Sequence, residues 1–587
     1  MLRTHNCGEL SEKDIGKPVA LCGWVGARRD HGQLIFIDLR DGYGITQIVF
    51  NPERDKALHK QGEMLRSEFV VRVEGTLERR PANTENDRIP TGRVEIIVTK
   101  IEVLNESITP PFEIMDAISV TEESRLKYRY LDLRRPLMQK SLRLRHKVCK
   151  LTRDYFDSKD FIEVETPVLT KSTPEGARDY LVPSRLNPGM FYALPQSPQL
   201  FKQLMMVASL DRYFQIAKCF RDEDLRADRQ PEFTQIDIEM SFVTEEDIFE
   251  LSEGLMKKLF KEAVGVDLKT PFPRMTYAEA MARFGCDKPD TRFGMELAEI
   301  SGIVEKSKFK IFQEAVKSKG RVIALAAKGC GSYSRGQIDE LTEFVKGCGA
   351  KGLANFKVEK GLLTSQIDKF FSKEELSAIK DASLASDGDM VFIVADKERI
   401  AYDAMSALRK LLGNRLGLID EKRFDLLWVV DFPLFKYNEE GKRWESEHHP
   451  FTSCRPDDVK FLDRPDDLRN VRSRSYDLVI NGTEMGSGSI RIHEKSMQER
   501  IFRIIGLGEE EARARFGFLL DAFKFGAPPH GGVAFGLDRL LTFFVGCESI
   551  RDVIAFPKSQ RAFCPLTSAP SHVDQRQLDE LSIRIKK

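Results

Sequence analysis

The chain has 587 residues, and 91 Lys and Arg balance 91 Asp and Glu, so its formal net charge is zero. With 41% hydrophobic and 31% charged residues, the composition excludes a disordered or fibrous protein. A single core rarely grows beyond roughly 250 to 300 residues, so we expect several domains. The balanced total charge gives no indication of a nucleic-acid partner, although local charge can do so.

The ten cysteines include no C-x-x-C pair, which argues against zinc ribbons and disulfide scaffolds and favours a reducing compartment. No apolar run approaches the roughly 18 residues of a membrane-spanning helix. The N-terminus, MLRTHNCGEL, has neither the apolar core of a signal peptide nor a transit-peptide pattern. These features predict a cytoplasmic protein.

Residues 17–104 contain five short strand patterns separated by Gly and Pro. They read VALCGWV, QLIFIDLRD, GITQIVF, SEFVVRVEGTLERR and GRVEIIVTKIEVL. Five strands of this length predict a small Greek-key barrel of the OB type, whose open face stacks single-stranded bases on aromatic side chains. Such barrels also serve as plain scaffolds, so the pattern alone leaves both readings open.

A linker with Pro110-Pro111 is expected next, followed by an amphipathic helix from about Met138 to Ser158 and a strand that ends at Pro167. Nine Lys or Arg lie between Arg125 and Lys147, against one acid. This basic stripe is either a solvated helix face or a surface that follows a phosphate backbone.

The stretch from Cys219 to Met240 has alternating segments, YFQIAKCF and FTQIDIEM, on both sides of a polar loop, which predicts an antiparallel hairpin. The loop is crowded with charge. Arginines near a strand end present planar forks that suit phosphate oxygens, whereas the alternative is a solvated hairpin tip.

The loop sequence FRDEDLRADRQPEF, followed by TQID, resembles motif 2 of the class II aminoacyl-tRNA synthetases, in the form carried by bacterial aspartyl enzymes. The resemblance implies that Arg221 grips the α-phosphate of ATP and the aminoacyl carboxylate, and that Phe233 stacks on adenine. It also places Asp222, Glu223 and Gln230 at the ATP site. A fixed guanidinium would stabilise the charge of the reacting phosphoryl group.

Two further segments resemble the other motifs of this family. The helix and strand ending at Pro167 resemble motif 1, which implies a homodimer. PPHGGVAFGLDRLLTFFVG reads as a strand turning into a helix at Gly536 and resembles motif 3. This implies that Arg539 meets the γ-phosphate, with Leu537 and Asp538 beside it.

The resemblance also implies a pocket for aspartate. Glu175 belongs to a Gly- and Pro-containing loop, residues 170–183, that would close over the substrate. The other implied pocket residues are Gln199 and Asp237 for the α-amino group, Lys202 and Arg491 for the side-chain carboxylate, Arg221, and His448. Lysine and arginine together argue for an acidic substrate side chain.

Asp477 and Glu484 carry the carboxylates that Mg²⁺ prefers, and the resemblance implies that they hold this ion beside ATP. The pair His448 and His449 could also bind a metal. Adjacent residues on an extended chain point to opposite faces, however, and no third ligand is evident.

The stretch W-V-x-x-R-R-D-x-G-x-L-I-F-I-D-L-R-D resembles the anticodon-binding domain of the aspartyl, asparaginyl and lysyl subgroup. The resemblance implies that Arg29, Phe36 and Gln47 contact the tRNA anticodon. His31 stands where many aspartate-only enzymes carry leucine, and relatives that charge both tRNA(Asp) and tRNA(Asn) often have histidine there. Charging both would link the protein to an Asp-tRNA(Asn) amidotransferase.

The sequence thus predicts an α+β protein, an OB β-barrel followed by an antiparallel-sheet catalytic domain of class II type. The expected regions are the barrel at 1–107, a linker at 108–136, catalytic parts at 137–289 and 419–560, an α+β insertion at 290–418 and a C-terminal extension at 561–587. The implied activity is ATP-dependent aspartylation of tRNA, in which Arg221, Glu223 and Arg539 act on the phosphates. An asparaginyl or lysyl relative and a non-catalytic RNA-binding paralogue remain as alternatives.

Overall fold

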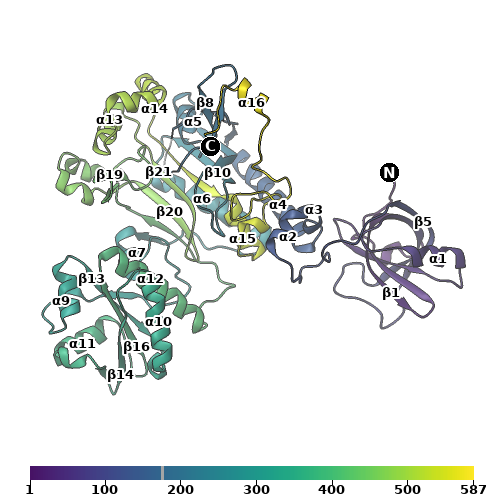
Figure 1. Ribbon diagram of the computed structural model, residues 1–587, viewed down its shortest axis with the longest axis horizontal. Coiled ribbons are helices and arrows are strands. Elements are labelled where there is room, and N and C mark those ends of the chain that lie inside the picture. The colour runs from purple at the N-terminus through teal and green to yellow at the C-terminus, as the bar shows by residue number, and fades with distance from the viewer. Residues whose placement is uncertain (174–176, 587) are drawn as a thin grey trace. The chain divides into compact units, whose positions relative to one another are not determined.

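The structure is a computed structural model that describes residues 1–173 and 177–586. Figure 1 shows the chain coloured from its N-terminus to its C-terminus. The chain divides into two compact units, Met1–Arg143 with Arg551–Ser571 and Leu144–Ile550 with His572–Lys587. No helix within the described ranges is long and apolar enough to span a membrane.

The first unit is built on a closed barrel whose strands pair in the order β1-β2-β3-β5-β4. Apolar side chains such as Leu21, Ile37 and Val73 fill the interior, and burial alternates along β2 and β4. The barrel elements are β1 (Pro18–His31), β2 (Leu34–Arg40), β3 (Ile45–Phe50), α1 (Lys56–Met64), β4 (Val70–Arg79) and β5 (Val94–Asn105).

Two short helices, α2 (Glu122–Lys127) and α3 (Arg129–Asp132), occupy the end of the segment that we predicted as a linker. They are held by Asp132, which is fully buried and accepts hydrogen bonds from Arg125, Arg129 and Arg135. The Arg129 guanidinium also donates to three backbone carbonyls within residues 551–555. A buried carboxylate surrounded by guanidinium groups therefore gives this segment a defined structure.

The second unit contains an eight-stranded sheet with the order β11-β17-β20-β21-β22-β10-β9-β6. Its two outer pairs, β11 with β17 and β6 with β9, are parallel, and the inner pairs are antiparallel. The strands are β6 (Ile162–Glu163), β9 (Arg212–Phe220), β10 (Glu232–Ser241), β11 (Arg274–Thr276), β17 (Leu426–Val430), β20 (Ser475–Ile480), β21 (Thr483–Ile490) and β22 (His530–Gly536).

Helices and two hairpins accompany this sheet. The helices are α4 (Pro136–Asp157), α5 (Gln199–Val207), α6 (Glu245–Leu259), α7 (Tyr277–Phe284), α13 (Lys495–Ile504), α14 (Glu509–Ala522), α15 (Leu537–Val545) and α16 (Gln575–Glu580). The hairpins are β7 (Leu181–Pro183) with β8 (Phe191–Ala193), and β18 (Phe435–Asn438) with β19 (Arg443–Ser446).

Between α7 and β17 the chain forms a second sheet, with the order β12-β13-β16-β14-β15. Apolar cores cover both of its faces, one with α10 and α12 and the other with α9 and α11, as Figure 1 shows. The elements are β12 (Leu297–Glu299), α8 (Ser301–Val304), α9 (Lys310–Lys317), β13 (Arg321–Ala327), α10 (Arg335–Gly347), β14 (Ala354–Glu359), β15 (Leu362–Thr364), α11 (Lys373–Ala382), β16 (Met390–Asp396) and α12 (Glu398–Arg415).

The predicted α+β class is confirmed, with a barrel and an antiparallel-centred sheet. The hairpin around the charged loop is β9–β10, and the strand that turns into a helix at Gly536 is β22 followed by α15. The exact domain boundaries stay a prediction.

Candidate active site

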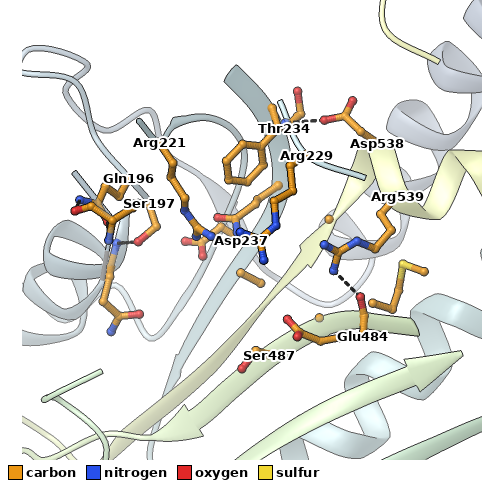
Figure 2. Close-up of a pocket in the computed structure, with 18 of the residues that line it drawn as sticks. Gln196, Ser197, Arg221, Arg229, Thr234, Asp237, Glu484, Ser487, Asp538 and Arg539 are labelled. Carbon is orange, nitrogen blue, oxygen red and sulfur yellow. Dashed lines mark hydrogen bonds between the residues drawn. The ribbon is translucent and has the colours of Figure 1, made fainter. Parts of the chain in front are cut away.

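A cavity of about 490 Å³ lies in the second unit, at the centre of the eight-stranded sheet. Its walls come from α5, the β9–β10 loop, β10, β21, β22, α15 and the loops that carry Lys288 and His448. Figure 2 shows charged side chains from several of these elements converging on it. Segments far apart in the sequence thus build one polar cavity.

One end of the cavity holds two cations and two carboxylates. Lys202 Nζ lies 2.8 Å from Asp237 Oδ1 and 3.2 Å from Glu239 Oε2. The Arg491 guanidinium binds both oxygens of Glu239, at 3.0 and 3.1 Å. All four side chains are almost fully buried, so each charge needs its partners.

The two carboxylates of this cluster differ in their electrostatics. Burial raises the pKa of Asp237 above its ordinary value, and Lys202 offsets only part of that effect. Burial also disfavours ionised Glu239, but Arg491 and Lys202 together outweigh it and lower the pKa of Glu239. The cluster therefore combines a firmly ionised Glu239 with a less acidic Asp237 beside the cavity.

Gly532 on β22 makes room for Glu239. A Cβ atom at this position would lie 2.1 Å from Glu239 Oε2 and 2.1 Å from the Ile238 carbonyl oxygen. Both contacts are far inside van der Waals range, so only glycine permits this approach of the two strands.

The two adjacent histidines face different partners. His449 Nε2 lies 2.9 Å from Nη1 of Arg491, whereas His448 Nε2 lies 3.4 Å from Asp477 Oδ1. Burial and then Arg491 lower the pKa of His449 well below its ordinary value, so it is neutral. Burial would lower the pKa of His448 as well, but the Asp477 carboxylate raises it.

A chain of hydrogen bonds leads from Gln199 at the cavity wall into the core. Gln199 Nε2 donates to Gln203 Oε1 at 3.3 Å, and Gln203 Nε2 lies 3.1 Å from His530 Nε2. His530 Nδ1 lies 2.7 Å from the Pro528 carbonyl, which can only accept, so Nδ1 carries the proton. His530 Nε2 is then the acceptor for Gln203.

The other end of the cavity is rich in arginine. Arg221 lies over the Phe233 ring at 5.0 Å from its centroid, and Arg229 pairs with Glu223 at 2.8 Å. Arg539 donates to the backbone carbonyl of Glu484, which Figure 2 marks with a dashed line. Three guanidinium groups around one cavity favour an anionic ligand with several oxygens.

Asp538 holds the start of α15 against β10. Its carboxylate accepts from the Thr234 backbone N–H at 2.7 Å and from the Arg145 guanidinium. The neighbouring Arg539 is thereby set at the cavity wall, while Leu537 is fully buried in the core.

Glu484 and Asp477 lie on the adjacent strands β21 and β20. Glu484 lines the cavity, and its carboxylate pairs with Lys288 at 3.0 Å. Asp477 is buried, and among the described residues its Oδ1 has no hydrogen-bond partner; the His448 ring lies 3.4 Å from it. No group of three or more metal-ligating side chains occurs within residues 1–173 and 177–586. Two carboxylates fit Mg²⁺ provided that phosphates and water complete its shell.

The barrel of the first unit carries a separate polar face. Arg29 binds both oxygens of Asp38, at 2.9 and 2.7 Å, and donates to Gln47 at 3.2 Å. Gln47 in turn donates to Glu95 at 2.7 Å. His31 meets Phe36 edge to face, with ring centroids 5.9 Å apart. The four residues predicted for the anticodon thus lie together on β1, β2 and β3.

Comparison with known proteins agrees with this geometry. A family model described as "tRNA synthetases class II (D, K and N)" matches residues 121–560, and one described as "OB-fold nucleic acid binding domain" matches residues 19–104. The chain belongs to the class II tRNA synthetases of the D, K and N group.

Relatives match over essentially the whole chain. A protein of Desulfatibacillum aliphaticivorans named "Aspartate--tRNA(Asp/Asn) ligase" is 55% identical over 100% of this chain and 98% of its own length. A protein of Ruminiclostridium cellulolyticum named "Aspartate--tRNA ligase" is 53% identical over 100% of this chain and 98% of its own.

Among solved structures, the asparaginyl-tRNA synthetase of Pyrococcus horikoshii has a TM-score of 0.59 and 18% identity, over 95% of this chain and 99% of that one. A putative aspartyl-tRNA synthetase of Leishmania major Friedlin has a TM-score of 0.59 and 21% identity, over 94% of both chains. At these identities the similarity shows the fold alone.

Most residues predicted for this class II site line the cavity: Gln199, Lys202, Arg221, Glu223, Gln230, Phe233, Asp237, His448, Glu484, Arg491, Gly536, Asp538 and Arg539. Asp222 lies outside it and pairs with Arg178 at 3.6 Å. Glu175 falls outside the described residues. The individual roles stay predictions.

The sequence analysis gave no role to Glu239, Gln203, His530 and Lys288, and it considered His449 only as a metal ligand. For Glu239 a signal existed, because residues two apart on a strand share a face and Asp237 was already assigned. Gln203 lies one helical turn after Gln199 on α5. His530 and Lys288 reach their partners only through tertiary contacts.

Proposed function

We propose that this protein is an aspartate–tRNA ligase: it activates L-aspartate with ATP and transfers the aspartyl group to the 3′ end of tRNA. The observation that supports this proposal is the arrangement of cationic side chains at two ends of one cavity. Lys202 and Arg491 form a buried carboxylate-binding end, and Arg221 with Arg539 forms a phosphate-binding end. The two reactants of an adenylation would therefore meet within one cavity.

In the first step an α-carboxylate oxygen of aspartate attacks the α-phosphate of ATP. The new oxygen–phosphorus bond replaces the bond to pyrophosphate, which leaves. In the second step the 3′-terminal ribose hydroxyl attacks the aspartyl carbonyl, loses its proton and releases AMP. Arg221 and Arg539 offset charge that develops on the phosphoryl oxygens, so the chain contributes chiefly position and electrostatics.

Family membership implies ATP as a substrate, generally with Mg²⁺. We assign Glu484 and Asp477 to this ion, because Glu484 lines the cavity and Asp477 Oδ1 has no hydrogen-bond partner in the part of the chain that the structure describes. Bound there, Mg²⁺ would supply charge neutralisation for the phosphates of ATP.

Selection of aspartate would follow from charge. A carboxylate can accept a charge-assisted hydrogen bond from Arg491 and an ionic contact from Lys202, whereas the amide of asparagine brings N–H groups against the same donors. A lysine substrate would bring a third cation. Asp237, beside the cavity, would bind the substrate ammonium group.

On the tRNA side, we assign Arg29, His31, Phe36 and Gln47 of the barrel to the anticodon. His31 is exposed beside the Phe36 ring, and on this basis we propose that the enzyme charges tRNA(Asn) as well as tRNA(Asp). A dual enzyme would depend on an amidotransferase to convert Asp-tRNA(Asn). The alternative is a strictly tRNA(Asp)-specific enzyme, and His31→Leu should then leave tRNA preference unchanged.

A homodimer in the cytoplasm, where translation uses charged tRNA, completes the proposal. Around the β7–β8 hairpin, Leu169, Leu181 and Phe191 are 52%, 56% and 48% exposed, and Met190 is 65% exposed. Thr170 bridges Ala193, so these apolar side chains come from neighbouring segments. A grouped apolar surface of this kind is typical of an interface. Sedimentation analysis of wild type and Phe191→Glu tests it, and a monomeric wild type would contradict it.

The decisive experiment uses purified protein in two assays. Aspartate-dependent exchange between ATP and labelled pyrophosphate tests activation, with asparagine and lysine as competing substrates. Charging of purified tRNA(Asp) and tRNA(Asn) with labelled aspartate tests transfer and tRNA choice. Exchange that depends on asparagine or lysine alone would identify the protein as an asparaginyl or lysyl enzyme of the same family. Absence of any exchange would favour the non-catalytic RNA-binding paralogue.

A further inference from the structure

The loop that leads from α7 into the insertion carries a lysine to the cavity. Lys288 lines the cavity wall, and its Nζ lies 3.0 Å from Oε2 of Glu484. The loop also includes Asp287, whose pKa is raised by burial and by nearby carboxylates, among them Asp477. Lys288 therefore brings a positive charge to a part of the cavity wall that carries carboxylates.

Residues where the insertion joins the catalytic sheet hold this loop in place. Arg409 on α12 is almost fully buried and donates to the backbone carbonyls of Asp290, Phe293, Gly294 and Met295. Its guanidinium also lies 4.0 Å from the centre of the Phe293 ring. Asp290 binds Arg292 at 2.8 and 3.0 Å, and it packs against Gly482 next to β21. The backbone after Lys288 is thus held by contacts with the insertion and the catalytic sheet.

Stability alone does not account for a lysine at this place. The Lys288 side chain is 41% exposed, and an ion pair that is partly open to water contributes little to stability. A lysine side chain ordinarily carries a full positive charge near neutral pH, and here it faces a carboxylate. A charged, reachable lysine in a cavity with Arg221, Arg229 and Arg539 matches a polyanionic ligand.

We propose that Lys288 is a catalytic residue that contacts the β- and γ-phosphates of ATP, the part that leaves as pyrophosphate. This inference rests on the proposed adenylation. In the protein without nucleotide, Lys288 neutralises Glu484; with ATP bound, its ammonium lies against the phosphate tail. It remains protonated throughout and offsets charge on the leaving group as the bond to the α-phosphate breaks. The insertion thereby contributes to ATP binding through the residues where it joins the catalytic sheet.

The test compares Lys288→Met, which keeps the aliphatic chain and removes the charge, with Lys288→Arg. Lys306→Met, at an exposed lysine of the insertion, is the matched control. Calorimetry measures binding of a non-hydrolysable ATP analogue, with and without Mg²⁺, and of pyrophosphate. Exchange kinetics give the KM values for ATP and aspartate.

Loss of a charge-assisted contact predicts roughly 10- to 100-fold weaker binding of analogue and pyrophosphate by Lys288→Met, with a matching rise in KM for ATP. The KM for aspartate should stay within about twofold, since the carboxylate-binding end is unchanged. Lys288→Arg should recover most of the affinity. Wild-type affinity in Lys288→Met, or equal loss in Lys306→Met, overturns the inference.

Asp290→Asn tests the contacts that hold the backbone after Lys288, without changing a side chain that lines the cavity. It should weaken analogue binding less than Lys288→Met does, and the double variant should resemble Lys288→Met, because both changes act through one side chain. Additive losses would contradict the coupling. If the wild-type protein shows no aspartate-dependent exchange, the proposed function itself is refuted. If the wild type is active and Lys288→Met binds the ATP analogue equally well, only this inference is refuted.

Discussion

His530 Nε2 accepts a hydrogen bond from the side-chain amide of Gln203, 3.1 Å away. The direction follows from the proton on Nδ1, which is committed to the Pro528 carbonyl at 2.7 Å. Gln203 must then turn its oxygen to Gln199, whose own oxygen is left for the cavity. A core histidine thus sets the orientation of an amide at the substrate end.

The first prediction concerns this relay. His530→Phe should raise the KM for aspartate about tenfold, because Gln203 loses its acceptor and no longer orients Gln199. The KM for ATP should change little. His572→Phe, at an exposed histidine, serves as the control. Equal increases for both substrates would indicate general damage instead of lost orientation.

A second prediction concerns acid stability. The pKa values of His449 and His530 both lie below the ordinary value in the folded protein, mainly through burial. Below about pH 6.5 the unfolded chain therefore binds protons at these two histidines that the folded protein does not bind. As a result, the free energy of unfolding decreases as the pH drops below this value, by up to about 1.4 kcal/mol per pH unit for each histidine. Urea denaturation of wild type and His530→Phe between pH 7.5 and about 5 checks this. The variant should show a shallower decline, and parallel curves would exclude His530 as a contributor.

A third prediction follows from the close approach at Gly532. Gly532→Ala places a methyl group where the Glu239 carboxylate lies, so Glu239 or the β10–β22 pairing must move. Because Glu239 holds Lys202 and Arg491, aspartate activation should fall by roughly 5- to 150-fold, which corresponds to the roughly 1 to 3 kcal/mol of core overpacking. Gly336→Ala, where a Cβ meets open space, is the control. Unchanged exchange in Gly532→Ala would show that the strands tolerate the shift.

A fourth prediction distinguishes two effects of Lys202, on the stability of the buried charge cluster and on aspartate activation. Lys202→Met leaves Asp237 and Glu239 buried with one cation between them, which should lower the free energy of unfolding by about 3 to 5 kcal/mol and abolish aspartate activation. Adding Asp237→Asn removes one uncompensated charge, so denaturation should show partial recovery of stability while exchange remains absent. Recovery of exchange in the double variant would argue against Lys202 as the carboxylate ligand.

A fifth prediction addresses the barrel. Gln47 joins Arg29 to Glu95 and lies on the face assigned to the anticodon. Gln47→Ala should reduce charging of tRNA, by an increased KM for tRNA of about tenfold, and leave ATP–pyrophosphate exchange unchanged. Lys60→Ala, at an exposed lysine on α1, is the comparison. Reduced exchange would show that the change reaches beyond tRNA binding.

Local patterns predicted much of the fold. Period-2 alternation located β9 and β10, and the barrel strands followed from short strand patterns separated by glycines and prolines. The helices α2 and α3 were not predicted, since they depend on the buried Asp132 cluster and on the hydrogen bonds from Arg129 to the backbone carbonyls of residues 551–555. Such stabilisation comes from tertiary contacts, which propensity does not encode.

The candidate site divides in the same way. Lys202, Arg221 and Arg491 could be named because their motifs resemble a family, although spacing alone would not bring α5, the β9–β10 loop and β21 to one cavity. His530 and Lys288 belong to segments whose sequences resemble ordinary loops or strands. Their partners, Gln203 and Glu484, are distant in the sequence and come near only after the sheet has formed.

The parallel pairing of β11 with β17 joins Thr276 to Val430 across the entire insertion. A ribosome must therefore release the five strands β12 to β16 before the edge of the catalytic sheet can close. Closing a disordered loop costs more as the loop grows, by about 0.6 kcal/mol for each doubling of its length. If the insertion folds first, Arg292 with Glu421 and Thr291 with Asp425 bring its two ends together, and the remaining gap is short. The insertion would then act during synthesis as an internal clamp that delivers β17 to its place.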